Sequence, residues 1–310
     1  AKSYESLLEL EPSSNSAYFN LAVCQEKLGR WAEAAANFQR VVAADAGRLD
    51  ARLGLGICLL HLKHAEKALE CFEICLEKGG AQETPVFGKA VALELLGRQD
   101  EAAALYESIL DTNPQAEEPM SNLIHIGMRR NDVATVQKWS ELLLALRPFS
   151  QAALEGLTWC AFIGENYDAA SKYCAKLVEQ TPENFERWYN LGVANQKMNR
   201  PEQAEKAYLE ASKLKSDHAQ TFANLGVVRQ ALNNERGARE AYETSLKLGP
   251  DQPEVLFNLA GLMEEQGQTE QAEELYGRLL QGNPDWEEAW FRMGYLQLTR
   301  AEAGGLIRRR

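Results

Sequence analysis

The sequence predicts an all-α fold in which antiparallel helical hairpins stack into a solenoid. The first indication is a 34-residue period, because steps of 34 from position 12 reach nine positions that hold six of the chain's ten prolines: Pro12, Pro114, Pro148, Pro182, Pro250 and Pro284. Proline cannot continue a helix, so these positions separate one unit from the next. The second indication is that each unit contains two segments with apolar residues at helical spacing. Such hairpins bury their apolar faces by stacking on their neighbours.

Residues 185–218 show how one unit is built. Trp188 and Gly192 lie four residues apart on one face of a first helix, and Ala204 and Tyr208 have the same spacing on a second helix. Gly192 and Ala204 are small where the two helices are expected to cross, so the backbones can approach closely. The aromatic rings then fill the space beside the crossing. The unit is therefore predicted to be an antiparallel helical hairpin.

A short turn is expected between the two helices of each unit. Unit position 15 is glycine or asparagine in six units, and both residues tolerate the left-handed backbone that ends a helix. These residues are Gly29, Gly97, Asn131, Asn199, Asn233 and Gly267. In the unit 185–218, Pro201 then suits the first turn of the second helix, where its missing N–H costs nothing.

The same unit carries a known repeat motif. Trp188, Leu191, Gly192, Ala204 and Tyr208 follow the order W-x2-L-G, a small residue and an aromatic residue. This spacing resembles the tetratricopeptide repeat (TPR) motif. The resemblance implies a right-handed superhelix whose first helices line a concave groove, and a role in binding proteins or peptides. No insertion or deletion interrupts the register, so the resemblance covers nearly the whole chain.

The register divides the chain into eight complete units and two halves. Residues 1–14 match the second helix of a truncated repeat, and residues 287–310 match the first helix of a ninth unit followed by a basic tail. In that tail, Gly304 and Gly305 are expected to weaken a helix. The complete units are expected at 15–48, 49–82, 83–116, 117–150, 151–184, 185–218, 219–252 and 253–286. Because the chain begins inside a helix, we expect it to be part of a longer protein.

One unit departs from the pattern. The unit 117–150 has Ile124 and Val136 where other units have small residues at the helix crossing, and Ser140 where they have an aromatic residue. These changes predict either a different superhelical pitch near residues 120–175 or local compensation by Trp139 and Trp159.

The composition limits the possible partners. Hydrophobic residues make up 45% of the chain and charged residues 25%, as expected for a folded soluble protein. The net charge of −12 makes nucleic acid an unexpected partner. No run of about 18 apolar residues occurs, so no membrane span is expected.

No catalytic, cofactor or metal site is predicted. The four histidines are dispersed and accompany no catalytic motif. Cys71 and Cys75 lie near His61 and His64, but the spacing matches no structural zinc pattern. The six cysteines are interpreted as small core residues, which suits a reducing compartment and a cytoplasmic protein. We expect no enzyme, although a catalytic domain outside these residues is compatible with the sequence.

Unit position 6 carries the main candidate binding residues. It faces away from the second helix of its own unit, and in TPR arrays it faces the groove. An amide side chain both donates and accepts hydrogen bonds, so a row of asparagines can bind the backbone of an extended peptide. The row resembles the asparagine ladder of the TPR region in O-linked N-acetylglucosamine transferases. The alternative is that each asparagine makes local contacts between helices. The polar residues at this position are Asn20, Asn122, Asn190, Asn224, Asn258 and Arg292.

Unit position 2 adds negative charge to the same groove. The candidates are Glu186, Gln220, Glu254 and Glu288. Between Asp251 and Trp290 there are ten acidic residues and one basic residue, a balance of −9. The alternative is a solvated acidic helix face. The acidic residues favour a neutral or basic peptide segment over one that ends in a free carboxylate.

The sequence therefore predicts a non-catalytic scaffold that binds an extended peptide or protein segment along the groove, with residues 186–292 as the strongest candidate region. One alternative is the substrate-recruiting arm of a larger enzyme such as a glycosyltransferase. Another is a scaffold that self-associates through its exposed terminal half-repeats.

Overall fold

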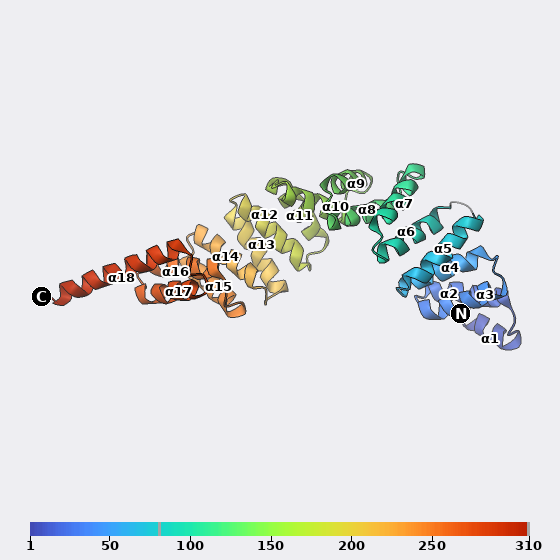
Figure 1. Cartoon of the computed structure of the whole chain (residues 1–310), viewed down its shortest axis with the longest axis horizontal. Coiled ribbons are helices and arrows are strands. Elements are labelled where there is room, and N and C mark those ends of the chain that lie inside the picture. Colours follow the sequence, from blue (N-terminus) through green and yellow to red (C-terminus); the bar gives the residue numbers. More distant parts are fainter. Residues whose placement is uncertain (80–81, 309–310) are drawn as a thin grey trace. The chain divides into compact units, whose positions relative to one another are not determined.

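The structure of the protein is a computed structural model that describes residues 1–79 and 82–308, with the backbone alone for residues 303–308. Its described residues form eighteen α-helices and no strand (Figure 1). The predicted all-α fold of stacked helical hairpins is confirmed. None of the described helices has the combination of length and apolarity that crossing a lipid bilayer requires.

Between the first and the last helix, successive helices pair as hairpins. In each hairpin the first helix has 13 residues and the second has 14 or 15. A single helix, α1 (Lys2–Leu10), precedes them, and a single helix, α18 (Glu287–Arg308), follows them. The hairpins are α2 (Asn15–Lys27) with α3 (Trp31–Ala44), α4 (Leu49–His61) with α5 (Ala65–Gly79), α6 (Glu83–Leu95) with α7 (Gln99–Thr112), α8 (Glu117–Arg129) with α9 (Val133–Leu146), α10 (Gln151–Ile163) with α11 (Tyr167–Gln180), α12 (Phe185–Lys197) with α13 (Pro201–Leu214), α14 (Ala219–Ala231) with α15 (Glu235–Leu248), and α16 (Pro253–Glu265) with α17 (Thr269–Gly282).

The chain divides into two compact units, Ala1–Gly156 and Leu157–Arg310, and the boundary falls within α10. Each unit has its own row of buried aromatic residues, contributed by the second helices. In the first unit these are Phe38, Phe72 and Tyr106. In the second unit they are Tyr208, Tyr242 and Tyr276. A fully buried aromatic side chain stabilises a fold by about 1.5–3 kcal/mol, so these rings are the main packing residues of both units.

The turns within the hairpins share one backbone conformation. All six predicted turn residues have a positive φ, between 53° and 77°. Lys63 (φ 59°) and Glu165 (φ 53°) occupy the same position and adopt the same conformation, which the sequence alone did not predict. A left-handed backbone costs an ordinary L-residue about 1–2 kcal/mol. The position in the repeat therefore determines the conformation even where the residue opposes it.

Side chains cap the N-termini of several helices. Asn184 and Asn234 accept hydrogen bonds from the backbone N–H groups of Arg187 and Gly237. His218 has the same role at the start of α14, where its Nδ1 accepts from the N–H of Thr221 at 3.3 Å. A side-chain cap of this kind usually stabilises a helix by about 1 kcal/mol.

The atypical hairpin α8–α9 is packed without an aromatic ring at its centre. Ile124, Val136 and Ser140 are fully buried, and Trp139 is also buried. A side chain added at Gly156 would collide with Ser140 and Ile124. Larger aliphatic side chains thus occupy the space that a ring fills in the other hairpins.

The end of the chain differs from the prediction. Helix α18 runs without interruption through Gly304 and Gly305 to Arg308, where a weakened helix and a separate tail were expected. Unit position 15 is Ala301 here, so the residue that ends the first helix in the other units is missing. Without that turn residue the helix continues, because a glycine raises its free energy by only about 1 kcal/mol. The predicted tail residues Arg309 and Arg310 lie outside the described residues.

Candidate functional site

Unit position 6 points away from its own second helix and packs on the second helix of the preceding hairpin. At Gly54 a Cβ atom would lie 2.5 Å from Cζ of Phe38, and at Gly88 it would lie 2.5 Å from Cζ of Phe72. The aromatic ring at position 24 of one hairpin therefore lies directly behind position 6 of the next. The nature of that ring decides what position 6 can carry.

Asn224, on α14, has a tyrosine behind it. Its Nδ2 donates to the hydroxyl oxygens of Tyr208 at 3.2 Å and Tyr189 at 3.3 Å, and its Oδ1 accepts from Nε2 of Gln220 at 3.0 Å. The side chain is half-buried. These bonds provide the local contacts between helices that were the alternative interpretation of the asparagine row.

The tyrosine hydroxyls are also held from their own first helix. Tyr208 donates to Gln196 at 2.7 Å and Tyr242 donates to Gln230 at 3.1 Å. Burial raises the pKa of both tyrosines well above the usual range, while a hydrogen bond from the next asparagine opposes the shift. Both hydroxyls therefore remain protonated donors at neutral pH.

The other asparagines of the row are held to different extents. Asn122 and Asn258 are half-buried and hydrogen-bond the hydroxyls of Tyr106 and Tyr242. Asn190, on α12, is half-buried and follows a hairpin that has Cys174 in place of a tyrosine. Asn20, on α2, is exposed. An amide that donates to one hydroxyl retains a second N–H and free lone pairs, so a bound segment can still hydrogen-bond to it.

Four predicted residues meet at one cleft between α14 and α16. Gln220, Asn224, Glu254 and Asn258 line a cleft of about 450 Å³, which we call the amide cleft. Its walls also include Ala223, Val227, Asp251, Gln252, Pro253 and Val255. The cleft combines amides, two carboxylates and small apolar surfaces, a composition suited to a peptide backbone and a cationic side chain.

The acidic residues at position 2 are exposed. Glu186, Glu254 and Glu288 lie in the first turns of α12, α16 and α18, and none of them makes an ion pair within the described part of the chain. Arg292 differs, because its Nη1 lies 3.4 Å from Oε1 of Glu264. Its charge is therefore partly neutralised. Asn20 and Asn122 belong to the first compact unit, whereas the other predicted residues belong to the second.

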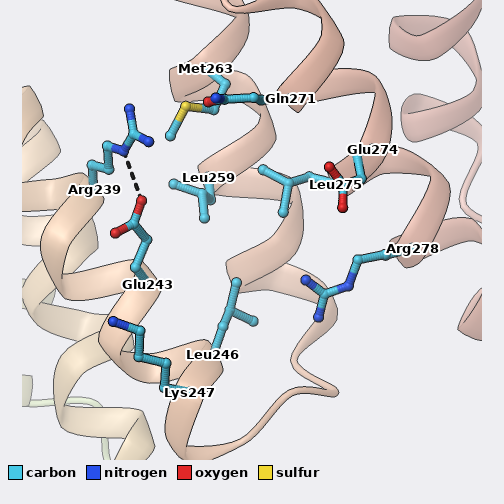
Figure 2. A pocket seen from close by; sticks show the side chains of 10 residues that line it. All are labelled: Arg239, Glu243, Leu246, Lys247, Leu259, Met263, Gln271, Glu274, Leu275 and Arg278. Atoms are coloured by element: carbon cyan, nitrogen blue, oxygen red, sulfur yellow. Dashed lines mark hydrogen bonds and ion pairs between the residues drawn. The ribbon is translucent and has the colours of Figure 1, made fainter.

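A second pocket lies among α15, α16 and α17 and was not foreseen (Figure 2). Leu246, Leu259 and Met263 form part of its apolar lining in a volume of about 330 Å³. Arg239 and Glu243 form an ion pair of 2.8 Å at its rim. No motif marks this pocket, because it arises from the spacing between helices.

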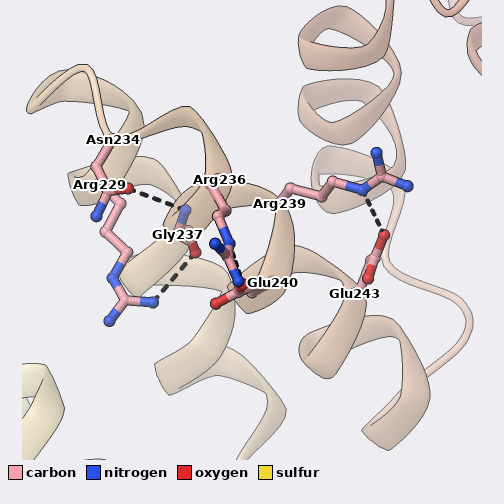
Figure 3. A network of polar contacts seen from close by, with 7 residues as sticks. All are labelled: Arg229, Asn234, Arg236, Gly237, Arg239, Glu240 and Glu243. Atoms are coloured by element: carbon pink, nitrogen blue, oxygen red, sulfur yellow. Dashed lines mark hydrogen bonds and ion pairs between the residues drawn. The ribbon is translucent and has the colours of Figure 1, made fainter.

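A polar network borders this pocket and fixes the start of α15 on α14 (Figure 3). Arg229, on α14, donates to the backbone carbonyl of Gly237 at 3.1 Å, and Asn234 accepts from the N–H of the same glycine at 3.0 Å. Arg229 also pairs with Glu205 at 2.9 Å. The network contributes to the geometry of α14, the helix that carries Gln220 and Asn224.

The cysteines lie where the sequence interpretation placed them, in or beside the core. Cys58, Cys71, Cys75 and Cys174 are buried, and burial raises the pKa of Cys58 to about 12 and that of Cys71 to about 11. Thiols with such pKa values are poor nucleophiles at neutral pH. Among the residues that the structure describes, no group of three histidine, cysteine or acidic side chains is arranged to hold a metal ion.

Comparisons of sequence support the repeat assignment. Three family models described as tetratricopeptide repeat match residues 27–78 and 231–293, residues 1–48 and 83–117, and residues 185–218. No curated protein matches the chain.

Solved structures share the fold at low sequence identity. YrrB, a TPR protein with an unusual peptide-binding site, is 17% identical with a TM-score of 0.57, over 61% of this chain and 97% of its own. MamA is 19% identical with a TM-score of 0.51, over 56% of this chain and 94% of its own. A TPR protein from Parabacteroides merdae is 15% identical with a TM-score of 0.53, over 85% of this chain and 100% of its own.

Proposed function

Because the chain belongs to the tetratricopeptide repeat family, whose members are protein-interaction scaffolds, we propose that it binds an extended peptide or protein segment along its first helices. The amide cleft carries this proposal, since Gln220, Asn224, Glu254 and Asn258 converge there from two successive first helices. Asn190, Glu186 and Glu288 extend the same pattern to the neighbouring first helices α12 and α18. The segment crosses these helices in turn.

The asparagines in this proposal have two roles. Asn258 keeps one amide hydrogen on the tyrosine bond that fixes its side chain, and its second N–H and its carbonyl oxygen bind peptide backbone. Asn224 donates to the hydroxyls of Tyr208 and Tyr189, so it binds the peptide through its carbonyl oxygen, which has a second lone pair beside the bond from Gln220. A side chain that is already held in place loses little rotational freedom when a ligand binds. The tyrosine contacts therefore favour binding by pre-organising the amides.

The charge of the cleft favours a neutral or basic ligand. Asp251 and Glu254 border it, and Glu186 and Glu288 are exposed on the neighbouring first helices. Exposed carboxylates attract lysine and arginine side chains mainly by raising the association rate, an effect that salt reduces. Binding of a basic segment should therefore weaken as the salt concentration rises.

The TPR fold generally supports interaction rather than catalysis, so no reaction is assigned to these residues. A recruiting arm of a larger enzyme such as a glycosyltransferase is compatible with the same groove. A cytoplasmic location remains our proposal, and the use of cysteines as small core residues supports it. A scaffold that self-associates through its terminal half-repeats is the other alternative.

The test compares three forms of the protein against one random peptide library. The first is the wild type, and the second is the triple variant Asn190→Ala, Asn224→Ala, Asn258→Ala. The third is the control variant Tyr208→Phe, Tyr242→Phe, which removes the hydroxyls and leaves the asparagines. Thermal melting of each form separates loss of binding from loss of structure.

We expect the triple asparagine variant to lose the peptides that the wild type selects, with a loss of about tenfold or more for three missing hydrogen-bond sites. The tyrosine variant should keep the same peptides with moderately reduced affinity. If the triple variant is folded and selects the same peptides with the same affinity, the asparagine row is purely structural and the proposal is wrong.

A further inference from the structure

Helix α18 has two apolar faces, of which only one is covered. Ala289 (0% exposed) and Leu296 (6% exposed) pack in the cluster that includes α17. Phe291, Tyr295 and Leu298 lie at i, i+4 and i+7 on another face and are 72%, 56% and 58% exposed. Three large hydrophobic side chains on one exposed face form an apolar surface that solvent does not favour.

The other hairpins show what normally covers Phe291 and Leu298, whereas Tyr295 holds position 9, which stays exposed in a complete hairpin as Val227 does (37% exposed). The aromatic residue at unit position 5 of a first helix packs against the aromatic residue at position 24 of the following second helix. The ring centroids lie 5.8 Å apart for Phe19 and Phe38, 5.6 Å for Phe87 and Tyr106, 5.9 Å for Tyr189 and Tyr208, and 5.8 Å for Phe257 and Tyr276. Phe291 holds position 5 in α18 and has no such contact among the described residues.

Helix α18 begins as α12 does, but its glycine lacks the ring that packs on the glycine of α12. Trp290 donates its Nε1–H to the carbonyl of Pro284 at 2.8 Å, and Trp188 makes the same bond to Pro182 at 2.8 Å. In α12 a Cβ atom on Gly192 would lie 2.5 Å from the Tyr208 ring, whereas at Gly294 nothing lies within 4 Å. The glycine of α18 is therefore open at the place where a ring packs on Gly192 in α12.

The described part of the chain does not fold back to fill this space. In each complete hairpin the chain turns at position 15, but α18 continues through Ala301 to Arg308. Phe291, Gly294 and Leu298 hold the unit positions that contact the second helix in the complete hairpins. Six of the eight second helices carry an aromatic residue at position 24, and these six define the required partner.

We propose that α18 binds an amphipathic helix of a partner protein, which packs on it as a second helix packs within a hairpin. The partner helix carries a small residue, an aromatic residue four positions later and a further small or apolar residue three positions after that. This is the pattern of Ala204, Tyr208 and Ala211 in α13. The surface is separate from the amide cleft.

The residue at unit position 12 limits which aromatic residue the partner carries, because a buried tyrosine hydroxyl needs an acceptor. Four position-12 residues accept a hydrogen bond from the tyrosine of their hairpin, and these are Glu94, Gln196, Gln230 and Glu264. Leu60 holds this position in the hairpin that contains Phe72, and Glu26 holds it in the hairpin that contains Phe38, so an acceptor permits tyrosine without requiring it. Leu298 holds it in α18, so a tyrosine hydroxyl would lose its acceptor there. The partner helix therefore carries phenylalanine.

The test uses synthetic helices taken from this protein as probes. The first peptide is residues 200–215 with the change Tyr208→Phe, the second has the native sequence, and the third carries Tyr208→Ala. Each is labelled with fluorescein, and its binding to the 310-residue chain is followed by fluorescence anisotropy. The blocking variant of the protein is Gly294→Leu, and the control is Gly277→Leu, because a Cβ atom added at either glycine would meet no other side chain within 4 Å.

We expect the Tyr208→Phe peptide to bind about tenfold more tightly than the native peptide, which buries an unpaired hydroxyl against Leu298. The Tyr208→Ala peptide should bind about 10- to 100-fold more weakly than the Tyr208→Phe peptide, because it lacks the ring. Gly294→Leu should abolish binding of all three, and Gly277→Leu should leave it unchanged.

Three results would overturn the proposal. The first is no binding of the Tyr208→Phe peptide to the wild type, and the second is equal binding to the Gly294→Leu variant. The third is a concentration-dependent dimer of the wild type that Gly294→Leu abolishes while no peptide binds. That result would assign the face to a second copy of the chain.

Discussion

The first and the last repeats use the same two positions in opposite ways. In residues 15–95 the buried rings are Phe38 and Phe72, and the next first helices place Gly54 and Gly88 against them. In residues 185–292 the rings are tyrosines, and the facing residues are asparagine or arginine. A phenylalanine ring that packs flat on a glycine leaves no room for a side chain. A tyrosine hydroxyl instead holds an amide in place, as it does for Asn224.

Position 6 carries an amide held by a tyrosine where the ring behind it leaves space for a side chain and offers a hydrogen-bonding partner. Both conditions hold at Asn122 in the first compact unit and at Asn224 and Asn258 in the second, and neither holds at Gly54 and Gly88. The residue behind the groove therefore decides the chemistry at its surface.

The largest expected effect comes from placing asparagine at position 6 in the first repeats, where the last repeats carry it. Gly54→Asn places a Cβ atom 2.5 Å from the Phe38 ring, which is fully buried and has little room to move. Overpacking of this kind costs about 1–3 kcal/mol, and we expect the upper part of that range. Urea denaturation measures the loss. Gly277→Asn is the control, because a Cβ atom added at Gly277 would meet no other side chain within 4 Å. A loss equal to that of the control would contradict the packing argument.

The next effect comes from removing the hydroxyl in the second region. Tyr208→Phe leaves Gln196 without its hydroxyl partner and removes one of the two hydroxyls that Asn224 contacts, so we expect a loss of about 1–2 kcal/mol in unfolding free energy. The ring itself and its contact with Gly192 remain. Thermal and urea unfolding of the single variant test this value. An unchanged stability would mean that the hydroxyl contributes nothing to the position of the amide.

A smaller effect concerns the left-handed turn within each hairpin, which the first and the last repeats share. Lys63 and Asn199 occupy the same left-handed turn, with φ of 59° and 53°. Lys63→Gly should stabilise the protein by about 1 kcal/mol, because glycine adopts this conformation without strain. Asn199→Gly should have less effect, since asparagine already tolerates the turn. Equal effects at the two positions, measured as unfolding free energies, would show that strain at Lys63 is negligible.

The smallest effect is the pH dependence that His218 adds to the unfolding free energy. Burial lowers the pKa of His218, and Lys215 adds to the shift while Asp217 and Glu186 oppose it. The neutral ring caps α14, so its contribution is present above the unfolded-state pKa of about 6.5 and is lost as the pH falls through the lower folded-state pKa. The loss should be under about 1 kcal/mol, the usual value of one cap.

His218→Asn keeps a capping side chain and removes the titration. The difference in unfolding free energy between pH 7.5 and pH 5 should therefore be smaller in this variant than in the wild type. Urea denaturation at the two pH values measures it. An identical difference in both proteins would assign the pH dependence to other groups.

Much of the fold could be predicted because the repeat supplies many independent examples of each position. The hairpin pattern and the turn at Asn199 follow from residue type alone. Lys63 and Glu165 could not be predicted as left-handed, because their own preference opposes the conformation that the packed helices impose. The continuation of α18 was missed because the glycine pair was read as a helix end, although no turn residue stands at Ala301.

The register predicts that the candidate site residues lie on first helices, but it does not reveal their contacts. The partner of position 6 is position 24 of the preceding unit. The signal was present in the sequence, since Phe38 and Phe72 precede glycines and Tyr208 and Tyr242 precede asparagines. The apolar face of α18 could not be recognised, because exposure depends on whether a neighbouring helix is present and not on the residues of one helix.

The most direct test of the central claim is NMR of side-chain amides during peptide binding. A basic peptide selected by the wild type is added to ¹⁵N-labelled protein, and the resonances of Gln220, Asn224 and Asn258 are compared with the backbone amides of Gly54 and Gly88. If the amide cleft binds the peptide, the three side-chain amides show large, saturable shifts and the two glycines show none. Shifts confined to the glycines, or absent from all five groups while the peptide binds, would contradict binding at the amide cleft.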